Sequence, residues 1–331
     1  MKQVDAMAEE KLKILYLMQM LLEETDPAHP MNATQLCEKM QARYDYSYNR
    51  KTIYTDIKRL QAYGMKIAQI KGNSFGYYVE KRDFDLAELK LLVDAVQSSK
   101  FITKEKSEDL IRKLARQTSN ENAKQLQRQV FIYNRIKADN DAIYSNVDAI
   151  HEAIQSNRQI GFKYCEWTVR KELVQKKGGA EYLVSPWALS WDDENYYLVA
   201  YEDASAKIKH YRVDKMQEIR VMEESRLGKE NFRDFDLAAY ARKTFGMYGG
   251  VDRKITLEGE NHLAGVVIDR FGTDVMIHPH DKEHFHAGVT VTVSPQFFGW
   301  LAGIGNGIRI TWPEDVREAY KQYLKAIIDN I

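Results

Sequence analysis

The sequence is poor in cysteine, carries no net charge and has no long, purely apolar run. Its two cysteines, Cys37 and Cys165, lie far apart and form no metal-ligand spacing. This pattern favours a reducing compartment in which both thiols are small core residues. The 48 lysines and arginines balance 48 aspartates and glutamates. That balance argues against a polybasic protein that coats nucleic acid, but it allows a local basic face.

Two stretches resemble targeting or membrane segments in part. The N-terminal sequence MKQVDAMAEEKLK is too charged for a signal peptide, and the apolar run after it is too short for a bilayer. Residues 287–308 lack charge over a sufficient length, but VTVTV alternates with period two, Pro295 interrupts the run and four glycines follow. This pattern predicts strand, turn, helix and turn. We therefore expect a cytoplasmic protein with no membrane partner.

Apolar periodicity predicts an α+β fold of several domains. The length suits two or three compact domains, and the patterns divide the chain into four segments. Residues 1–82 read as three helices followed by a β-hairpin, and residues 83–145 as a helical connector. Residues 146–226 show the short strands of a strongly bent sheet or small β-barrel. Residues 227–331 read as a C-terminal α+β module.

The three N-terminal helices have recognisable ends. The first, over residues 8–24, is predicted from the spacing of Leu12, Leu15, Tyr16, Met18 and Leu22. Asn32 is the expected N-cap of the second, and Ser47 or Asn49 that of the third, which ends at Gly64. Three helices followed by a hairpin are typical of a winged helix-turn-helix, whose third helix places its N-terminal side chains in the DNA major groove.

The third helix and the hairpin supply the candidate DNA-binding residues. Between residues 43 and 72 there are seven basic residues and two acids. The residues expected at the base edges are Ser47, Tyr48, Asn49, Arg50, Lys51 and Thr52. Those expected at the phosphates of double-stranded DNA are Tyr54, Lys58, Lys71 and Asn73. Tyr48 could equally pack at the start of the helix, and the alternative for the whole segment is a helix bundle with a solvated basic face.

The strands over residues 182–212 combine aromatic and cationic side chains. Alternation places Tyr197 and Tyr201 on one face, and His210 and Arg212 share a face on the next strand. Such a face suits a stacked base or a phosphate. The alternative is a barrel core with ordinary surface cations. The candidate effector-binding residues are Tyr182, Ser185, Trp187, Tyr197, His210 and Arg212.

These motifs resemble the bacterial WYL-domain transcriptional regulators. The resemblance rests on RKTIYTDIKRLQAYG with GYYV, on SPWALSWDDENYYLVAYE with KHYRVDKM, and on the C-terminal SPQFFGWLAGIGNGIRITW. The Trp-Tyr-Leu triplet that gives the family its name corresponds to Tyr196, Tyr197 and Leu198, so tyrosine replaces tryptophan at its first position. The resemblance places the family's basic pocket residue at Arg212. The resemblance implies a homodimeric regulator with a small Sm/SH3-like barrel. Its barrel would bind a nucleotide-like or nucleic-acid effector that changes operator affinity.

Two other functions are alternatives to DNA binding with an effector. HPHDKEHFH places four histidines together, His278, His280, His284 and His286, which with nearby carboxylates could hold zinc in a metal-responsive regulator. The alternative is a polar hairpin tip, and we expect no metal or cofactor. GIGNG at residues 303–307 lacks the rest of a phosphate-binding loop. No local signature assembles a catalytic site, so we do not expect an enzyme; the alternative is a nucleic-acid-processing enzyme with an attached DNA-binding domain.

Overall fold

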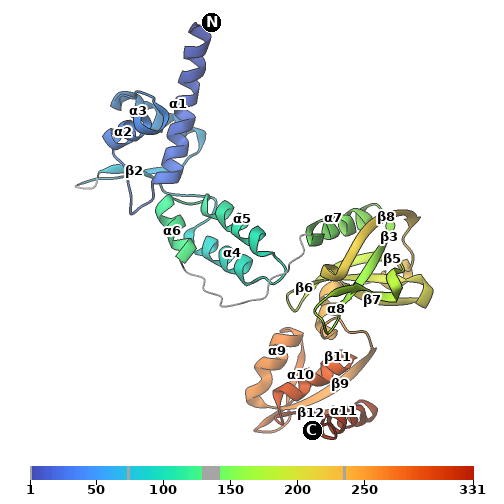
Figure 1. Cartoon of the computed structure of the whole chain (residues 1–331). Helices are drawn as coiled ribbons and strands as arrows, with labels where there is room; N and C mark the ends of the chain where they lie inside the picture. Colours follow the sequence, from blue (N-terminus) through green and yellow to red (C-terminus); the bar gives the residue numbers. More distant parts are fainter. Residues whose placement is uncertain (1, 73–74, 129–141, 234–235) are drawn as a thin grey trace. The chain divides into compact units, whose positions relative to one another are not determined.

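The computed structural model describes residues 2–72, 75–128, 142–233 and 236–331. The chain is a mixed α/β protein that divides into two compact units, residues 1–139 and 140–331 (Figure 1). Asn73, a predicted phosphate contact, lies outside the described residues.

The first unit begins with three helices and a two-stranded antiparallel hairpin. These elements are α1 (Lys2–Glu24), α2 (Ala33–Tyr44), α3 (Arg50–Tyr63), β1 (Ile67–Ile70) and β2 (Gly76–Val79). Asn32 caps α2 and forms a capping box with Gln35. Gly64 ends α3 with a φ of 117°, a left-handed conformation that favours glycine. The hairpin, the cap of α2 and the end of α3 are confirmed, whereas α1 begins at Lys2 and not at residue 8 as expected.

The apolar face expected for the first helix was partly wrong. Leu12 and Leu15 are 42% and 50% exposed, whereas Leu17, Met20 and Leu21 are fully buried against α2 and α3. The cause is the run ILYLMQMLL, which is apolar on every side of the helix, so its periodicity does not single out one face. The stripe of α3 is confirmed, since Ile53, Ile57 and Leu60 lie in this core.

Three further helices complete the described part of this unit: α4 (Leu86–Ser98), α5 (Lys104–Ala115) and α6 (Asn120–Arg128). Asp85 and Glu88 form the expected capping box, and Thr103 caps α5 through Lys106 N. Leu89 and Val93 of α4 are buried.

The second unit opens with α7 (Ala142–Gln155), which packs on a curled antiparallel sheet. Its strands are β3 (Arg158–Trp167), β4 (Leu173–Gln175), β5 (Tyr182–Asp192), β6 (Asn195–Glu202), β7 (Lys207–Arg212) and β8 (Met216–Ser225). They run in the order β4-β3-β5-β6-β7, and β8 pairs with β3. Ile150 and Ala153 of α7 share a core with Phe162, Leu198 and other strand residues. Short 3-10 turns at Lys176–Gly179, Asp203–Ser205 and Val213–Lys215 (η3) connect the strands.

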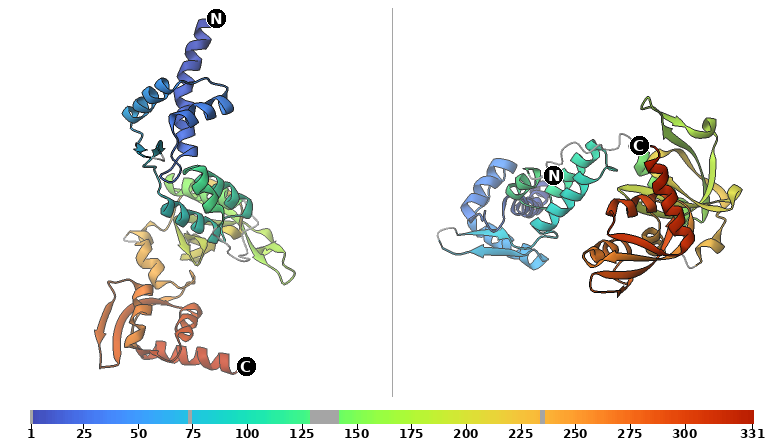
Figure 2. Two further views of the ribbon diagram at one scale, coloured as in Figure 1. Left: turned by 90° about the vertical axis from the view of Figure 1, so that its left-hand side faces the viewer. Right: turned by 90° about the horizontal axis from the view of Figure 1, so that it is seen from below.

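The remaining residues form a second, four-stranded antiparallel sheet with helices on one face (Figure 2). The elements are the 3-10 turns Lys229–Phe232 and Asn261–Leu263, α8 (Leu237–Lys243), β9 (Val251–Glu260), α9 (Ala264–Phe271), β10 (Met276–Pro279), β11 (His284–Val293), α10 (Pro295–Ile304), β12 (Ile308–Trp312) and α11 (Glu314–Ile328). The charge-free residues 287–308 form strand and helix as expected, and no helix in the described ranges is long and apolar enough to cross a membrane. The sequence patterns did not identify α9.

Candidate nucleic-acid interface and ligand site

The start of α3 is held by a local pair of side chains. Asn49 Oδ1 accepts hydrogen bonds from Thr52 N (2.9 Å) and from Thr52 Oγ1 (3.1 Å). Asn49 is therefore the N-cap, of the two residues that the sequence left open. Because both side chains serve the cap, their first role is to begin the helix at Arg50.

Tyr48 lies in the core and not on the exposed face of α3. It is 9% exposed, and its hydroxyl donates to Asp56 Oδ2 at 2.9 Å. Burial, followed by the hydrogen bond to Asp56, raises the pKa of Tyr48. Arg59 donates to the other oxygen of Asp56 at 2.8 Å. The expectation that Tyr48 faces the base edges is corrected, because Asp56, eight residues later, draws its hydroxyl inward.

Several cations on α3 and the hairpin are exposed and lack a carboxylate partner. Within the described residues, no ion pair involves Arg50, Lys51, Lys58 or Lys71. Other cations of the same unit are paired: Lys39 with Glu24 at 2.7 Å, and Arg43 with Glu23 at 2.6 Å. Arg50, Lys51, Lys58 and Lys71 are therefore a group of exposed cations without a carboxylate partner among the described residues; Lys81, Lys104 and Arg116 elsewhere in the unit also have none.

Polar and aromatic residues share this surface. Ser47 and Tyr54 are exposed, and the Tyr54 ring lies 6.2 Å from the ring of Tyr77 on β2, which ties the helix to the hairpin. Thr55 is also exposed, with its hydroxyl donating to Lys51 O at 3.0 Å. The sequence reasoning missed Thr55, although its position four residues after Lys51 places both on one side of a helix.

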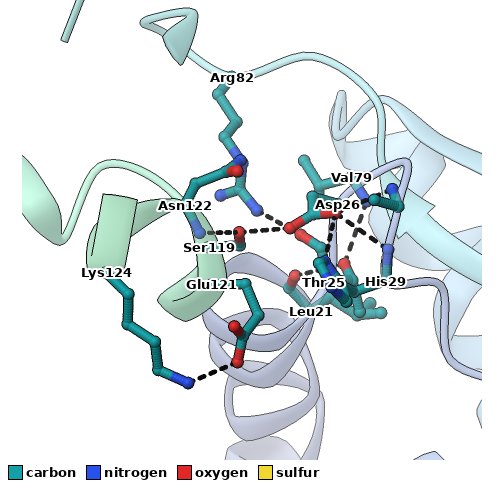
Figure 3. Close-up of polar contacts among 11 residues, drawn as sticks. Leu21, Thr25, Asp26, His29, Val79, Arg82, Ser119, Glu121, Asn122 and Lys124 are labelled. Atoms are coloured by element: carbon teal, nitrogen blue, oxygen red, sulfur yellow. Dashed lines mark hydrogen bonds and ion pairs between the residues drawn. The ribbon is translucent and has the colours of Figure 1, made fainter. Parts of the chain in front are cut away.

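A buried carboxylate joins the three-helix segment to the connector helices (Figure 3). Asp26, after α1, is 3% exposed. Its Oδ2 accepts a hydrogen bond from Ser119 Oγ (2.5 Å) just before α6, and its Oδ1 accepts from Ala28 N and His29 N, both at 2.9 Å. His29 Nδ1 also lies 2.9 Å from Oδ1. Residues 93 positions apart in the chain thus meet at one carboxylate.

A second set of contacts fixes the strand that leads out of the hairpin (Figure 3). Thr25 Oγ1 donates to Leu21 O and accepts from Val79 N, and Arg82 Nη2 donates to Thr25 O at 2.7 Å. Burial raises the pKa of Asp26, but hydrogen bonds from Ser119, His29 and the backbone more than compensate and hold it below its usual range. The ionised carboxylate is therefore the form that this junction favours.

On the curled sheet, Tyr197 and Arg212 lie directly opposite each other on β6 and β7. Arg212 donates to Asp214 through two parallel bonds, Nε to Oδ1 at 3.0 Å and Nη2 to Oδ2 at 2.7 Å. The hydrogen bond to Asp214 raises the pKa of Arg212 despite partial burial. Of the six predicted effector-binding residues, these two are the pair that the structure brings together beside solvent.

A further cation near Arg212 was missed. Burial, and then repulsion by Arg212, lowers the pKa of Lys215, and Lys176 adds to the effect while Asp214 opposes it. Lys215 follows the Arg212 strand by three residues in the turn η3, so the signal was present in KHYRVDKM. Arg212 is paired with Asp214 and Lys176 with Glu166 at 3.0 Å, so Lys215 is the cation of this group that has no ion pair in the described part of the chain.

The other predicted effector-binding residues have structural partners. Ser185 Oγ accepts from Leu227 N at 2.8 Å, and Trp187 Nε1 donates to Leu227 O at 2.9 Å. Both therefore hold the segment after β8. His210 lies 2.9 Å from Tyr240 Oη of α8, and its burial lowers its pKa to about 4. Tyr182 stacks on Phe162 at 5.6 Å on the core side of the sheet. These four side chains therefore have contacts within the fold, and their role in binding an effector stays a prediction.

Comparison with known proteins assigns the middle of the chain. Residues 145–221, which include most of α7 and the strands β3 to β7, match the WYL domain family, so the chain contains a WYL domain. No curated protein matches the sequence. Among solved structures, the chain is similar to proteasome accessory factor B/C (PafBC) of Arthrobacter aurescens, with 17% identity, a TM-score of 0.30 and coverage of 95% of this chain and 47% of that one. It thus spans about half of that protein's length.

A second solved structure, described as a CRISPR Cas-related protein, is similar at 13% identity and a TM-score of 0.35, over 74% of this chain and 71% of that one.

Proposed function

We propose that the protein is a DNA-binding transcriptional regulator and not an enzyme. In this proposal the three-helix segment with its hairpin, residues 2–79, is a winged helix-turn-helix. Helix α3 enters the major groove, and the hairpin tip approaches the adjacent phosphates. The resemblance to WYL-domain regulators further suggests a homodimer, in which two α3 helices lie about 34 Å apart and read a near-palindromic site.

One observation carries the proposal: Arg50, Lys51, Lys58 and Lys71 gather on α3 and the hairpin, are exposed, and form no ion pair among the described residues, whereas Lys39 and Arg43 of α2 are paired with carboxylates. Uncompensated cations on one surface attract a polyanion, and each phosphate that they neutralise releases counterions. Arg50 lies at the first turn of α3, where a guanidinium can form two hydrogen bonds with guanine. Lys58 lies two turns further on and suits a phosphate.

The ligand side of the proposal concerns the WYL domain. Arg212, Lys215 and Tyr197 offer a guanidinium, an ammonium and an aromatic ring at one end of the curled sheet. A nucleotide-like or nucleic-acid effector presents a phosphate and a base to such a surface. Its binding would change operator affinity if it favours one arrangement of the DNA-binding segments over another.

The test is selection of bound genomic fragments at two salt concentrations, followed by affinity measurements on the enriched sequence. We expect Arg50→Ala to weaken binding by about 1–3 kcal/mol and to relax sequence preference at one position. Lys58→Ala should weaken binding to all sequences alike and reduce the salt dependence by about one phosphate contact. Lys124→Ala, in α6 and paired with Glu121 at 2.6 Å, is the matched control and should change neither. Failure to enrich any sequence, or unchanged affinity in both test variants, would overturn the proposal.

A further inference from the structure

The outer face of the C-terminal sheet carries a row of ionisable side chains. His278 of β10, His286 of β11, Glu258 of β9 and Arg309 of β12 are successive partners across the four strands. Residues that alternate with them, such as Phe285 and Leu257, lie in the core beneath the helices. Side chains alternate between the faces of a strand, so the row lies on the face that points away from this core.

A third imidazole, that of His280, joins this row between β10 and β11. Asp281 Oδ1 accepts hydrogen bonds from Glu283 N and His284 N, and its carboxylate lies 3.0 Å from His284 Nδ1. The Asp281 carboxylate thereby holds the His284 side chain within the turn. His280, before the turn, instead stacks on His286 with ring centroids 4.1 Å apart.

Glu258 is held in place beside the two rings. It is largely buried, and its Oε1 accepts a hydrogen bond from Arg309 Nη2 at 2.5 Å. Its Oε2 lies 3.1 Å from His286 Nε2. Arg309 thus orients the carboxylate and leaves Oε2 directed at the imidazoles, an arrangement in which a neighbouring group fixes a metal-binding carboxylate.

The donor atoms of Glu258, His280 and His286 all lie within 4.8 Å of one another. Ligands on one tetrahedral zinc ion, at bond lengths near 2.1 Å, are about 3.4 Å apart. The longest of these separations would therefore have to shorten by at most about 1.4 Å, which rotation of the exposed His280 side chain can supply. The ligand atoms of His278 and His284 do not join this group in the described part of the chain.

We propose that Glu258, His280 and His286 form a binding site for a divalent transition metal of the zinc type. Two imidazoles and one carboxylate suit Zn²⁺, whereas Mg²⁺ and Ca²⁺ prefer oxygen ligands throughout. Three protein ligands leave a fourth position for water or an added ligand. The site lies on a sheet that the DNA-binding proposal does not use. A negative result in the test of one proposal therefore leaves the other proposal unchanged.

The experiment is titration of the full chain, stripped with a chelator, with Zn²⁺ by calorimetry, and with Co²⁺ by visible absorption. We expect one tight site per chain and the absorption bands of a tetrahedral cobalt ion with nitrogen and oxygen ligands. His286→Ala and Glu258→Gln should each weaken Zn²⁺ binding by at least about tenfold. His284→Ala, in the same hairpin and tied to Asp281, is the matched control and should bind as the parent does.

Several results would overturn the site. They are millimolar binding that His286→Ala leaves unchanged, equal loss in His284→Ala, and more than one equivalent site per chain. Circular dichroism of each variant without metal separates loss of the site from loss of the fold. If His286→Ala is unfolded, His280→Ala provides the same test, because His280 is exposed and its removal leaves the contact of His286 with Glu258 in place.

Discussion

Replacing Asp26 with alanine tests whether one buried carboxylate joins the three-helix segment to the connector helices. The substitution leaves the Ser119 hydroxyl buried without its acceptor, and such a loss costs about 1–3 kcal/mol. Ala28 and His29 are exposed, so their N–H groups can bond to water at smaller cost. We therefore expect the first unit to lose about 2–4 kcal/mol of stability. Asp26→Asn retains one carbonyl acceptor and should cost about 1 kcal/mol.

The distribution of tryptophan allows the two units to be followed separately. All five tryptophans of the sequence lie beyond residue 166, in the second unit. Among the described residues, the helices of the first unit contain more residues than those of the second, so circular dichroism at 222 nm reports mainly the first unit. In urea, Asp26→Ala should shift the circular-dichroism transition and leave the tryptophan transition in place. The exposed Asp94→Ala, in α4, is the control and should change stability by less than about 0.5 kcal/mol.

The pH dependence of the same variant gives an independent check. Because the pKa of Asp26 is below its usual value in the folded chain, its ionised form contributes stability above about pH 4. This contribution is lost as the pH falls through the lower, folded value. The difference between the parent and Asp26→Ala should therefore shrink in acid. An equal difference at pH 7 and pH 3, or an unchanged circular-dichroism transition at neutral pH, would refute the junction as described.

Two further predictions concern the second unit. The pKa of His210 is about 4 in the folded chain against 6.5 unfolded, so acid favours the unfolded state and about 3 kcal/mol should be lost between pH 7 and pH 4. His210→Gln should remove that loss from tryptophan-monitored unfolding, and the exposed His151→Gln should retain it. Arg212→Ala should leave DNA affinity without effector within about twofold but abolish the response to any active member of a panel of nucleotides and short single-stranded oligonucleotides. A response that persists in this variant would remove Arg212 from the ligand site.

Much of the fold could be predicted because its signals are local. The caps at Asn32, Asp85 and Thr103 are satisfied by backbone N–H groups within three residues, so the sequence contains the whole interaction. The stripe of α3 is similarly local, since its apolar residues recur at helical spacing between polar ones. The face of α1 could not be predicted, because surplus apolar residues leave its orientation to tertiary packing.

The sites were harder to predict because residues far away in the sequence bond to the polar atoms of the candidate side chains. Ser185 and Trp187 have polar atoms that suit a ligand, but Leu227, about forty residues later, uses both. The histidine-rich hairpin shows the converse. Its sequence suggested four equivalent ligands, whereas the turn uses His284 and strand pairing brings in Glu258 from 28 residues earlier. Neither outcome is encoded in local spacing.

The Arg212–Asp214 pair sets a condition on any anionic effector of the WYL domain. An anion that takes both guanidinium bonds must displace a carboxylate that already holds them. Asp214 lies in η3, and the buried Asn146 side chain of α7 donates to Val213 O and Met216 O on either side of it, at 3.2 and 2.9 Å. Displacing Asp214 would therefore strain the contacts that seat α7. An effector that leaves the Arg212–Asp214 pair intact does not disturb the contacts of α7 with η3 in this way. Because a ligand shifts an equilibrium only by its differential affinity for the two states, the binding of such an effector would leave the position of α7 unchanged.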